Sequence, residues 1–145
     1  MKNEKQKTAL VILSDGFEDI EAVAPIDVLT RSGVAVTIAS LGDDNVAGAY
    51  GTTIVPHKSL ELVNDRYDAI VLPGGKKNAE TLAAHPKVRQ MILEQHKQGR
   101  IVAAICASPS HVLAEAAGIL KGRRATGDPS FNDRLKSAGA IVTKR

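Results

Sequence analysis

Cysteine is almost absent from this chain of 145 residues, in which Cys106 is the only one. A lone cysteine cannot form an internal disulfide, so we expect a protein of a reducing compartment, the cytoplasm. The charged and polar first residues are not followed by the apolar segment that a secretory signal requires. Free cysteines are often just small buried hydrophobic residues, and this alternative stands beside that of a reactive thiol.

Aromatic residues and long apolar runs are also scarce. The chain has two phenylalanines, two tyrosines and no tryptophan, and its net charge is +3. Scattered basic side chains with so few stacking partners argue against specific nucleic-acid binding. No apolar stretch approaches the roughly 18 residues of a membrane span, so no membrane partner is expected. With 43% hydrophobic and 24% charged residues, the chain is expected to form one soluble domain over residues 1–145.

Short aliphatic runs alternate with segments of helical spacing, which predicts an α/β fold with a mostly parallel central sheet. Runs without alternating polarity at 8–13 and 34–40 are typical of strands buried on both faces, and further short apolar runs lie at 69–72, 101–105 and 140–143. Helices are expected at 18–31, at 78–98 with a break at Pro86, and at 129–138. Pro25 should bend or restart the first helix. The glycine-rich stretch 41–56 predicts a small antiparallel excursion.

Three loops follow the predicted strands and should meet at the carboxyl edge of the sheet. They are Ser14–Glu18, Pro73–Gly75 and Cys106–Pro109. If their strands are neighbours, these loops bring a carboxyl group, flexible peptide N–H groups and a thiol into one pocket.

Cys106 stands at a strand-to-helix corner, where peptide N–H groups favour the thiolate. We therefore expect its pKa to lie below the free value of about 8.5. The backbone N–H groups of Gly74, Gly75 and Ala107 could stabilise an oxyanion. Glu18 could donate a hydrogen bond to the thiolate when protonated. Taken alone, the Pro-Gly-Gly sequence is usually a turn, and Glu18 usually a residue that favours a helix start.

Three motifs in this order closely resemble a known family. They are Gly16-Phe17-Glu18, Leu72-Pro73-Gly74-Gly75 and Ala103-Ala104-Ile105-Cys106-Ala107-Ser108-Pro109. Through them the chain resembles the DJ-1 branch of the ThiJ/PfpI superfamily, from Ala9 to Arg145. The resemblance implies a flavodoxin-like three-layer sandwich, usually a homodimer. It also implies Cys106 as the nucleophile and oxidation-sensitive thiol, Glu18 as its carboxyl partner, and Gly75 with Ala107 as N–H donors.

The activities that the resemblance implies need no cofactor. They are glyoxalase chemistry, which converts methylglyoxal to lactate, and protein deglycase activity on early glycation adducts, both in protection against oxidative and carbonyl stress. The partner would then be a small reactive carbonyl compound or a glycated protein. The alternative from another class is a noncatalytic redox sensor or chaperone with an oxidisable cysteine. A flavodoxin-type nucleotide binder is less favoured, because Ser14-Asp15-Gly16 has only one glycine.

This chain departs from the family at two histidine positions. The peptidase branch has a histidine directly after its nucleophile, where this chain has Ala107, so proteolysis is not expected. Members of the DJ-1 branch often have a later histidine where this chain has Asp128, so a Cys–His pair is not expected and Asp128 is a possible pocket residue.

The chain's own histidines are expected to have structural places. His111, five residues after Cys106, is interpreted as a helix-surface or interface residue. The remaining three, His57, His85 and His96, lack the spacing of metal ligands, so no metal is expected.

The resemblance implies a Gly-Pro-rich loop and a long helix beyond the last residues, Lys144-Arg145. We expect cleavage by a trypsin-like protease after Arg145, with the C-terminal fragment of the same protein still associated. Arg145 is also a possible pocket residue.

Overall fold

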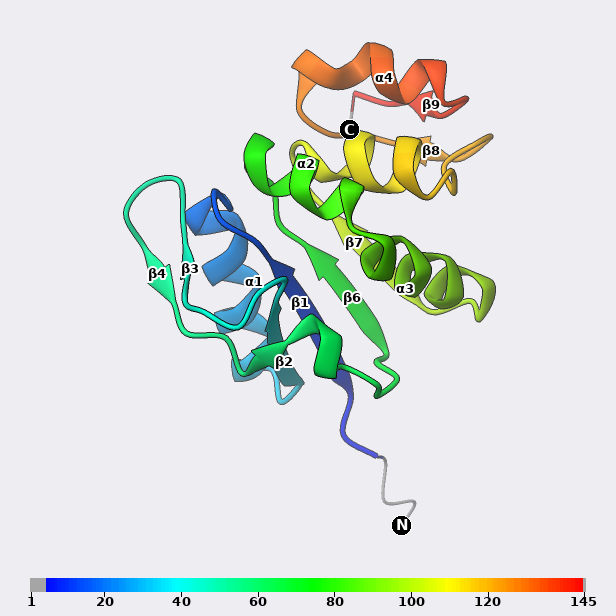
Figure 1. Cartoon of the computed structure of the whole chain (residues 1–145). Helices are drawn as coiled ribbons and strands as arrows, with labels where there is room; N and C mark the ends of the chain where they lie inside the picture. Colours follow the sequence, from blue (N-terminus) through cyan, green and yellow to red (C-terminus); the bar gives the residue numbers. More distant parts are fainter. Residues whose placement is uncertain (1–4, 145) are drawn as a thin grey trace.

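A five-stranded parallel sheet in the order β5–β2–β1–β6–β7 lies at the centre of the computed structural model, which describes residues 5–144 (Figure 1). Its strands are β1 (Thr8–Leu13), β2 (Ala35–Ser40), β5 (Lys58–Ser59), β6 (Ala69–Leu72) and β7 (Ile101–Ala104). All four strand pairings in this sheet are parallel. The predicted parallel α/β architecture is therefore confirmed.

Strand β1 divides the hydrophobic core into two layers. Leu10 and Ile12 face a cluster that includes residues of α2 (Lys76–Ala84) and α3 (Pro86–Lys97). Val11 and Leu13, which alternate with them, face a second cluster with residues of α1 (Asp19–Arg31). Burial of each such aliphatic side chain stabilises the fold by roughly 1.5–3 kcal/mol. Because β1 is buried on both faces, its sequence shows no polar alternation.

The two prolines expected to interrupt helices behave differently. Pro86 is the first residue of α3, where its missing N–H costs nothing, and the predicted break is confirmed. The sequence predicted a bend or a restart of the helix at Pro25. The restart is wrong, because α1 continues without interruption from Asp19 to Arg31 and includes Pro25. Ala22 and Ile26, on either side of Pro25, pack in the same core cluster and hold the helix together.

Two small sheets flank the central one. The predicted antiparallel excursion is confirmed by β3 (Val46–Ala47) and β4 (Thr53–Ile54). The last aliphatic run does not join the central sheet, because β9 (Ile141–Val142) pairs instead with β8 (Arg124–Ala125). The other short elements are the 3-10 helices η1 (Leu60–Leu62) and η3 (Pro129–Phe131), the π-helix η2 (Pro109–Ala116), and α4 (Asn132–Ser137).

One face of the sheet is open beside α1. Ile101 and Ile105, at the two ends of the β7 run, are 63% and 50% exposed. A groove of 460 Å³ there is lined by Pro25, Val28, Leu29, Ala69, Val71, Leu72, Ile101, Ala103, Ala104 and Ile105. The apolar composition of the 101–105 strand suits burial, but one of its faces is open in this structure. Within residues 5–144, none of the helices has the length and apolar character needed to cross a bilayer.

Candidate active site

The candidate site lies where the strand order of the sheet reverses. The chain goes from β1 to β2 on one side and later adds β6 on the other side of β1 (Figure 1). Ligand sites of open α/β sheets form at such a point, outside the carboxyl ends of the strands. A pocket of 540 Å³ occurs there, and it brings the three predicted loops together. Its lining residues are Asp15, Gly16, Glu18, Ala47, Gly48, Ala49, Tyr50, Gly75, Lys76, Lys77 and Cys106.

Cys106 occupies a strained corner directly after β7. Its φ of +60° lies in the left-handed region, which costs a residue other than glycine about 1–3 kcal/mol. The corner is fixed from two sides: the Cys106 carbonyl accepts the Asp128 N–H at 2.8 Å, and the Ser108 hydroxyl donates to the Pro73 carbonyl at 2.6 Å. The thiol is half-buried and lines the pocket, so it is not a sealed core residue.

The carboxyl group in contact with the thiol belongs to Glu21. Its Oε2 accepts the N–H of Gly74 at 2.8 Å, and the interaction between this carboxyl group and Cys106 affects the pKa of both groups. A Cβ atom at position 74 would lie 2.2 Å from Glu21 Oε2 and 2.6 Å from Cys106 Cβ. Only glycine therefore allows the thiol and the carboxyl group to approach each other here.

Glu18, predicted as the carboxyl partner, has another contact in the structure. It is the N-cap residue of α1, and its Oε2 accepts the N–H of Glu21 at 2.8 Å. Its side chain lines the pocket, but the contact with Cys106 is made by Glu21, one turn further along the helix. The spacing of an N-cap residue and a glutamate three positions later could have revealed this division of roles from the sequence.

A second carboxyl group, from a segment 22 residues further along the chain, lies near the sulfur. Cys106 Sγ lies 3.9 Å from Asp128 Oδ2, within hydrogen-bonding distance for a thiol donor. The other carboxylate oxygen of Asp128 accepts the N–H of Ser130 at 2.8 Å and caps η3. The thiol thus has a second carboxyl group nearby, contributed by Asp128.

Comparison with known proteins identifies the family. The sequence pattern of the DJ-1/PfpI family matches residues 7–145. The chain belongs to this family. It is 39% identical over 132 residues to the Parkinson disease protein 7 homolog of Danio rerio, covering 89% of this chain and 69% of that protein. It is 33% identical over 132 residues to a protein of Thermococcus kodakarensis named as a deglycase, covering 90% of this chain and 78% of that protein.

A solved structure of the same family supports the fold. Drosophila melanogaster DJ-1beta superposes with a TM-score of 0.89 at 34% identity, over 97% of this chain and 71% of that one. The flavodoxin-like α/β sandwich predicted from the family resemblance is thereby confirmed.

In this member of the DJ-1/PfpI family, burial acts on both partners of the thiol–carboxyl pair. Burial raises the pKa of the Glu21 carboxyl group, and the negative charges of Glu18 and Asp128 raise it further. Burial likewise raises the pKa of the Cys106 thiol, and Glu21 adds to this effect. The prediction of a lowered thiol pKa is therefore wrong, because the N–H groups of Gly75 and Ala107, which do lower it, are outweighed.

The raised pKa of Cys106 predicts how its reactivity depends on pH. The rate of alkylation by iodoacetamide should rise with a midpoint above about 8.5, and Glu21→Gln should lower that midpoint. The native thiol holds its proton more tightly than the unfolded chain does. The stabilisation that Cys106 contributes is thus present at pH values below the pKa of the thiol in the unfolded chain. It is lost as the pH rises through the pKa of the thiol in the folded protein. A wild-type midpoint well below that of a free cysteine would contradict the assignment.

The three predicted N–H donors act on different groups. Those of Gly75 and Ala107 lower the pKa of the Cys106 thiol. The N–H of Gly74 instead donates to Glu21, so it orients the carboxyl group and is not free to bind an oxyanion.

Gly75 provides a test of how tightly the loops are packed. It has a φ of +87°, and a Cβ there would lie 2.2 Å from the Gly16 carbonyl oxygen. Gly75→Ala should lower the free energy of unfolding in urea by about 2 kcal/mol or more, through clash and backbone strain together. Gly33→Ala is the matched control, because Gly33 has a φ of +85° with nothing within 4 Å of the added atom. Equal losses in the two variants would show that the contact between the loops is unimportant.

Other predicted residues lie elsewhere. Arg145 is outside the described residues. His57 Nδ1 accepts the N–H of Ile38 at 2.8 Å in the fold, and His85 lies 3.8 Å from Glu61.

The interpretation of His111 as a surface or interface residue is wrong, because it is 2% exposed. The prediction assumed α-helical spacing, whereas His111 lies in a π-helix beneath Phe131 and Arg134.

Proposed function

We propose that this protein is a Cys106-dependent enzyme that acts on reactive carbonyl compounds, as a glyoxalase or protein deglycase, without a cofactor. The observation that supports it is that the Cys106 thiol lines a pocket open to solvent and has the Glu21 carboxyl group beside it, both next to Gly74. A nucleophile and a proton-transfer group within hydrogen-bonding distance are what covalent catalysis on a carbonyl group requires. The deglycase name of the Thermococcus kodakarensis relative points to the same class of substrate.

The first step is addition of the thiol to the aldehyde carbon of an α-oxoaldehyde. The sulfur forms a bond to carbon, the carbonyl π bond opens, and the thiol proton passes through Asp128 to the new oxygen, giving a hemithioacetal. Hydrogen bonding lowers the pKa of Asp128, whereas burial raises that of Glu21. Two acids with pKa values pushed apart suit opposite roles, so Asp128 accepts the thiol proton as the ionised partner. The N–H groups of Gly75 and Ala107 stabilise the negative charge that forms on oxygen.

The second step moves a proton between neighbouring carbons. Glu21, once ionised, removes the proton from the carbon bound to sulfur, and the resulting enediol is reprotonated on the next carbon. The product is a thioester of a 2-hydroxy acid. Water then cleaves the thioester, releasing lactate from methylglyoxal and restoring the thiol. A raised pKa brings the carboxyl group nearer to the working pH, which favours its use as both base and acid.

The test is turnover by the purified protein without added thiol or cofactor. Consumption of methylglyoxal with matching release of lactate supports the glyoxalase type, and release of an amine from an early glycation adduct supports the deglycase type. If the folded protein consumes neither methylglyoxal nor the glycation adduct at any pH, the proposed enzymatic function is wrong.

The second candidate function is a noncatalytic redox sensor or chaperone. The sulfur lies among N–H donors that would also receive sulfinate oxygens. However, oxidation requires the thiolate, and two carboxyl groups with a raised thiol pKa oppose it. Oxidation of Cys106 by dilute peroxide without any carbonyl turnover would favour the sensor.

We also propose a homodimer in the cytoplasm. Ile20 and Val23 on α1 are 73% and 43% exposed, an apolar surface that a second copy would cover. Light scattering that gives a mass near 15.3 kDa for the protein in solution would contradict the dimer.

We further propose that a C-terminal fragment of the same protein packs in the apolar groove between α1 and β7. The groove is almost wholly apolar, and the Danio rerio relative is longer, with 69% of its length covered. Intact-mass measurement on denatured protein should then show a companion peptide. A single 15.3 kDa species would contradict the fragment.

A further inference from the structure

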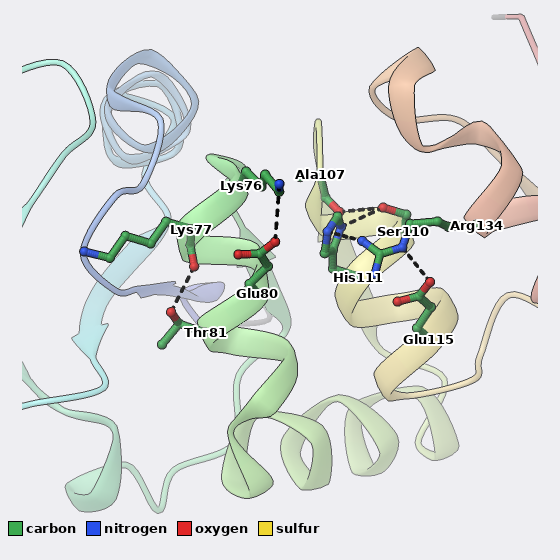
Figure 2. Close-up of polar contacts among 9 residues, drawn as sticks. All are labelled: Lys76, Lys77, Glu80, Thr81, Ala107, Ser110, His111, Glu115 and Arg134. Carbon is green, nitrogen blue, oxygen red and sulfur yellow. Dashed lines mark hydrogen bonds and ion pairs between the residues drawn. The ribbon is translucent and has the colours of Figure 1, made fainter.

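His111 is buried directly behind the reactive corner, although the mechanism above does not use it. It is 2% exposed, and both of its ring nitrogens have partners (Figure 2). Nδ1 lies 2.8 Å from the carbonyl oxygen of Ala107, the residue after the nucleophile. Nε2 contacts the guanidinium group of Arg134, and the ring meets Phe131 edge-on at 4.7 Å between centroids.

The partners of the ring determine where its proton lies. A guanidinium group has only donors, so Nε2 must accept from Arg134 and carry no hydrogen. The hydrogen is then on Nδ1 and is donated to the Ala107 carbonyl. The Ser110 hydroxyl donates to the same carbonyl at 2.9 Å. The imidazole therefore links the Cys106–Ala107 corner, which it contacts through Nδ1, to Arg134, which it contacts through Nε2.

Arg134 connects this ring to the segment that carries the second acid. Its Nε also lies 2.7 Å from Glu115 Oε1, so the guanidinium group is held by two side chains of η2, His111 and Glu115 (Figure 2). Phe131 and Arg134 belong to the short helical segment that begins at Asp128. Any displacement of this segment would therefore move the Asp128 carboxylate away from the thiol.

We propose that His111 is a positioning residue, which sets the distance between the Asp128 carboxylate and the Cys106 thiol by joining Ala107 to Phe131 and Arg134. This inference depends on the proposed function only in taking Cys106 as the reacting group. Its chemical consequence is that the thiol keeps a proton acceptor at a fixed distance while the pocket remains open.

The test measures the pH midpoint of Cys106 alkylation by iodoacetamide in the full chain. Asp128→Asn removes a negative charge that favours the neutral thiol, so its midpoint should fall by about 0.5–1 pH unit. The His111→Asn side chain is uncharged, and its amide N–H can still donate to Ala107. It is too short to place an acceptor within reach of Arg134. The alkylation midpoint of His111→Asn should fall by at least half as much as that of Asp128→Asn. His111→Gln, whose amide oxygen can reach Arg134, should restore most of the wild-type midpoint.

The double variant separates positioning from general loosening. In the Asp128→Asn background, His111→Asn should cause no further shift, because the group that it positions is already gone. An unchanged midpoint in His111→Asn, or an equal further shift in the double variant, would overturn the proposal. If His111→Asn does not fold, Arg134→Lys replaces it, since it keeps the charge but loses the planar fork.

Lys136→Gln on the outer side of α4 is the matched control. Its side chain is 64% exposed and pairs only with exposed Asp133, so its midpoint should equal that of the wild type. The assay does not involve turnover. A protein that consumes no carbonyl compound would refute the proposed function and leave this test valid.

Discussion

Replacing Cys106 by alanine is expected to abolish methylglyoxal consumption. The sulfur is the atom that bonds to the aldehyde carbon, and an alanine side chain has no nucleophile to take its place. Lactate release by the purified variant, followed at the wild-type pH optimum, should not exceed that of buffer. Urea unfolding should show that the variant remains folded, because only one small, half-buried side chain is changed.

A chemical control is available because the chain has no other thiol. Iodoacetamide should inactivate the wild-type protein in proportion to the fraction of Cys106 modified, without any mutation. Cys106→Ser, which keeps the size and the hydrogen-bonding capacity of the side chain, should be as inactive as the alanine variant. Wild-type turnover in the alanine variant would remove Cys106 from the reaction and with it the proposed mechanism.

Glu21→Gln is expected to reduce turnover about 100-fold or more. The glutamine keeps an oxygen for the N–H of Gly74, so the loop should stay in place. It cannot remove the carbon-bound proton, so the hemithioacetal should form but not isomerise. The loss should appear in kcat rather than in KM, because the pocket that binds the substrate is unchanged.

The matched control is Glu18→Gln. Glu18 is also a glutamate, it is the N-cap residue of the same helix, and it lines the pocket. Its glutamine variant keeps an oxygen to cap the helix and should retain turnover close to that of the wild type. An equal loss in both variants would mean that the two carboxyl groups act together, and a loss only in Glu18→Gln would return the role to Glu18.

The strands could be predicted from the sequence because burial on both faces of a parallel sheet leaves a direct compositional record, whereas their order in the sheet came only from the structure. Aliphatic runs such as 8–13 and 69–72 have no polar alternation, and the structure places both in the central sheet. Pro86 likewise marked a helix start by a local steric rule. Residues 140–143 resembled these runs, but pair with Arg124–Ala125 outside the central sheet, since composition does not choose a pairing partner.

The place of the site could also be predicted, but the partners within it could not. Parallel strands end at one edge, so the loops with Cys106, Gly75 and Glu18 had to meet there. Glu18 and Glu21 lie on one face of one helix turn, and the sequence does not say which caps the helix and which meets the thiol. The choice depends on where Gly74 leaves room for a carboxyl oxygen.

By itself the sequence determined the α/β class, the edge of the sheet where three loops meet, and the one thiol among them. These follow from periodicity and from the presence of a single thiol. Only the tertiary structure decided that Glu21 lies beside the thiol, that Asp128 lies 3.9 Å from the sulfur, and that His111 is buried. It also reversed the expected direction of the thiol pKa. The physical reason is that desolvation and charge depend on which groups from distant segments surround an atom, and no local pattern in the chain encodes that.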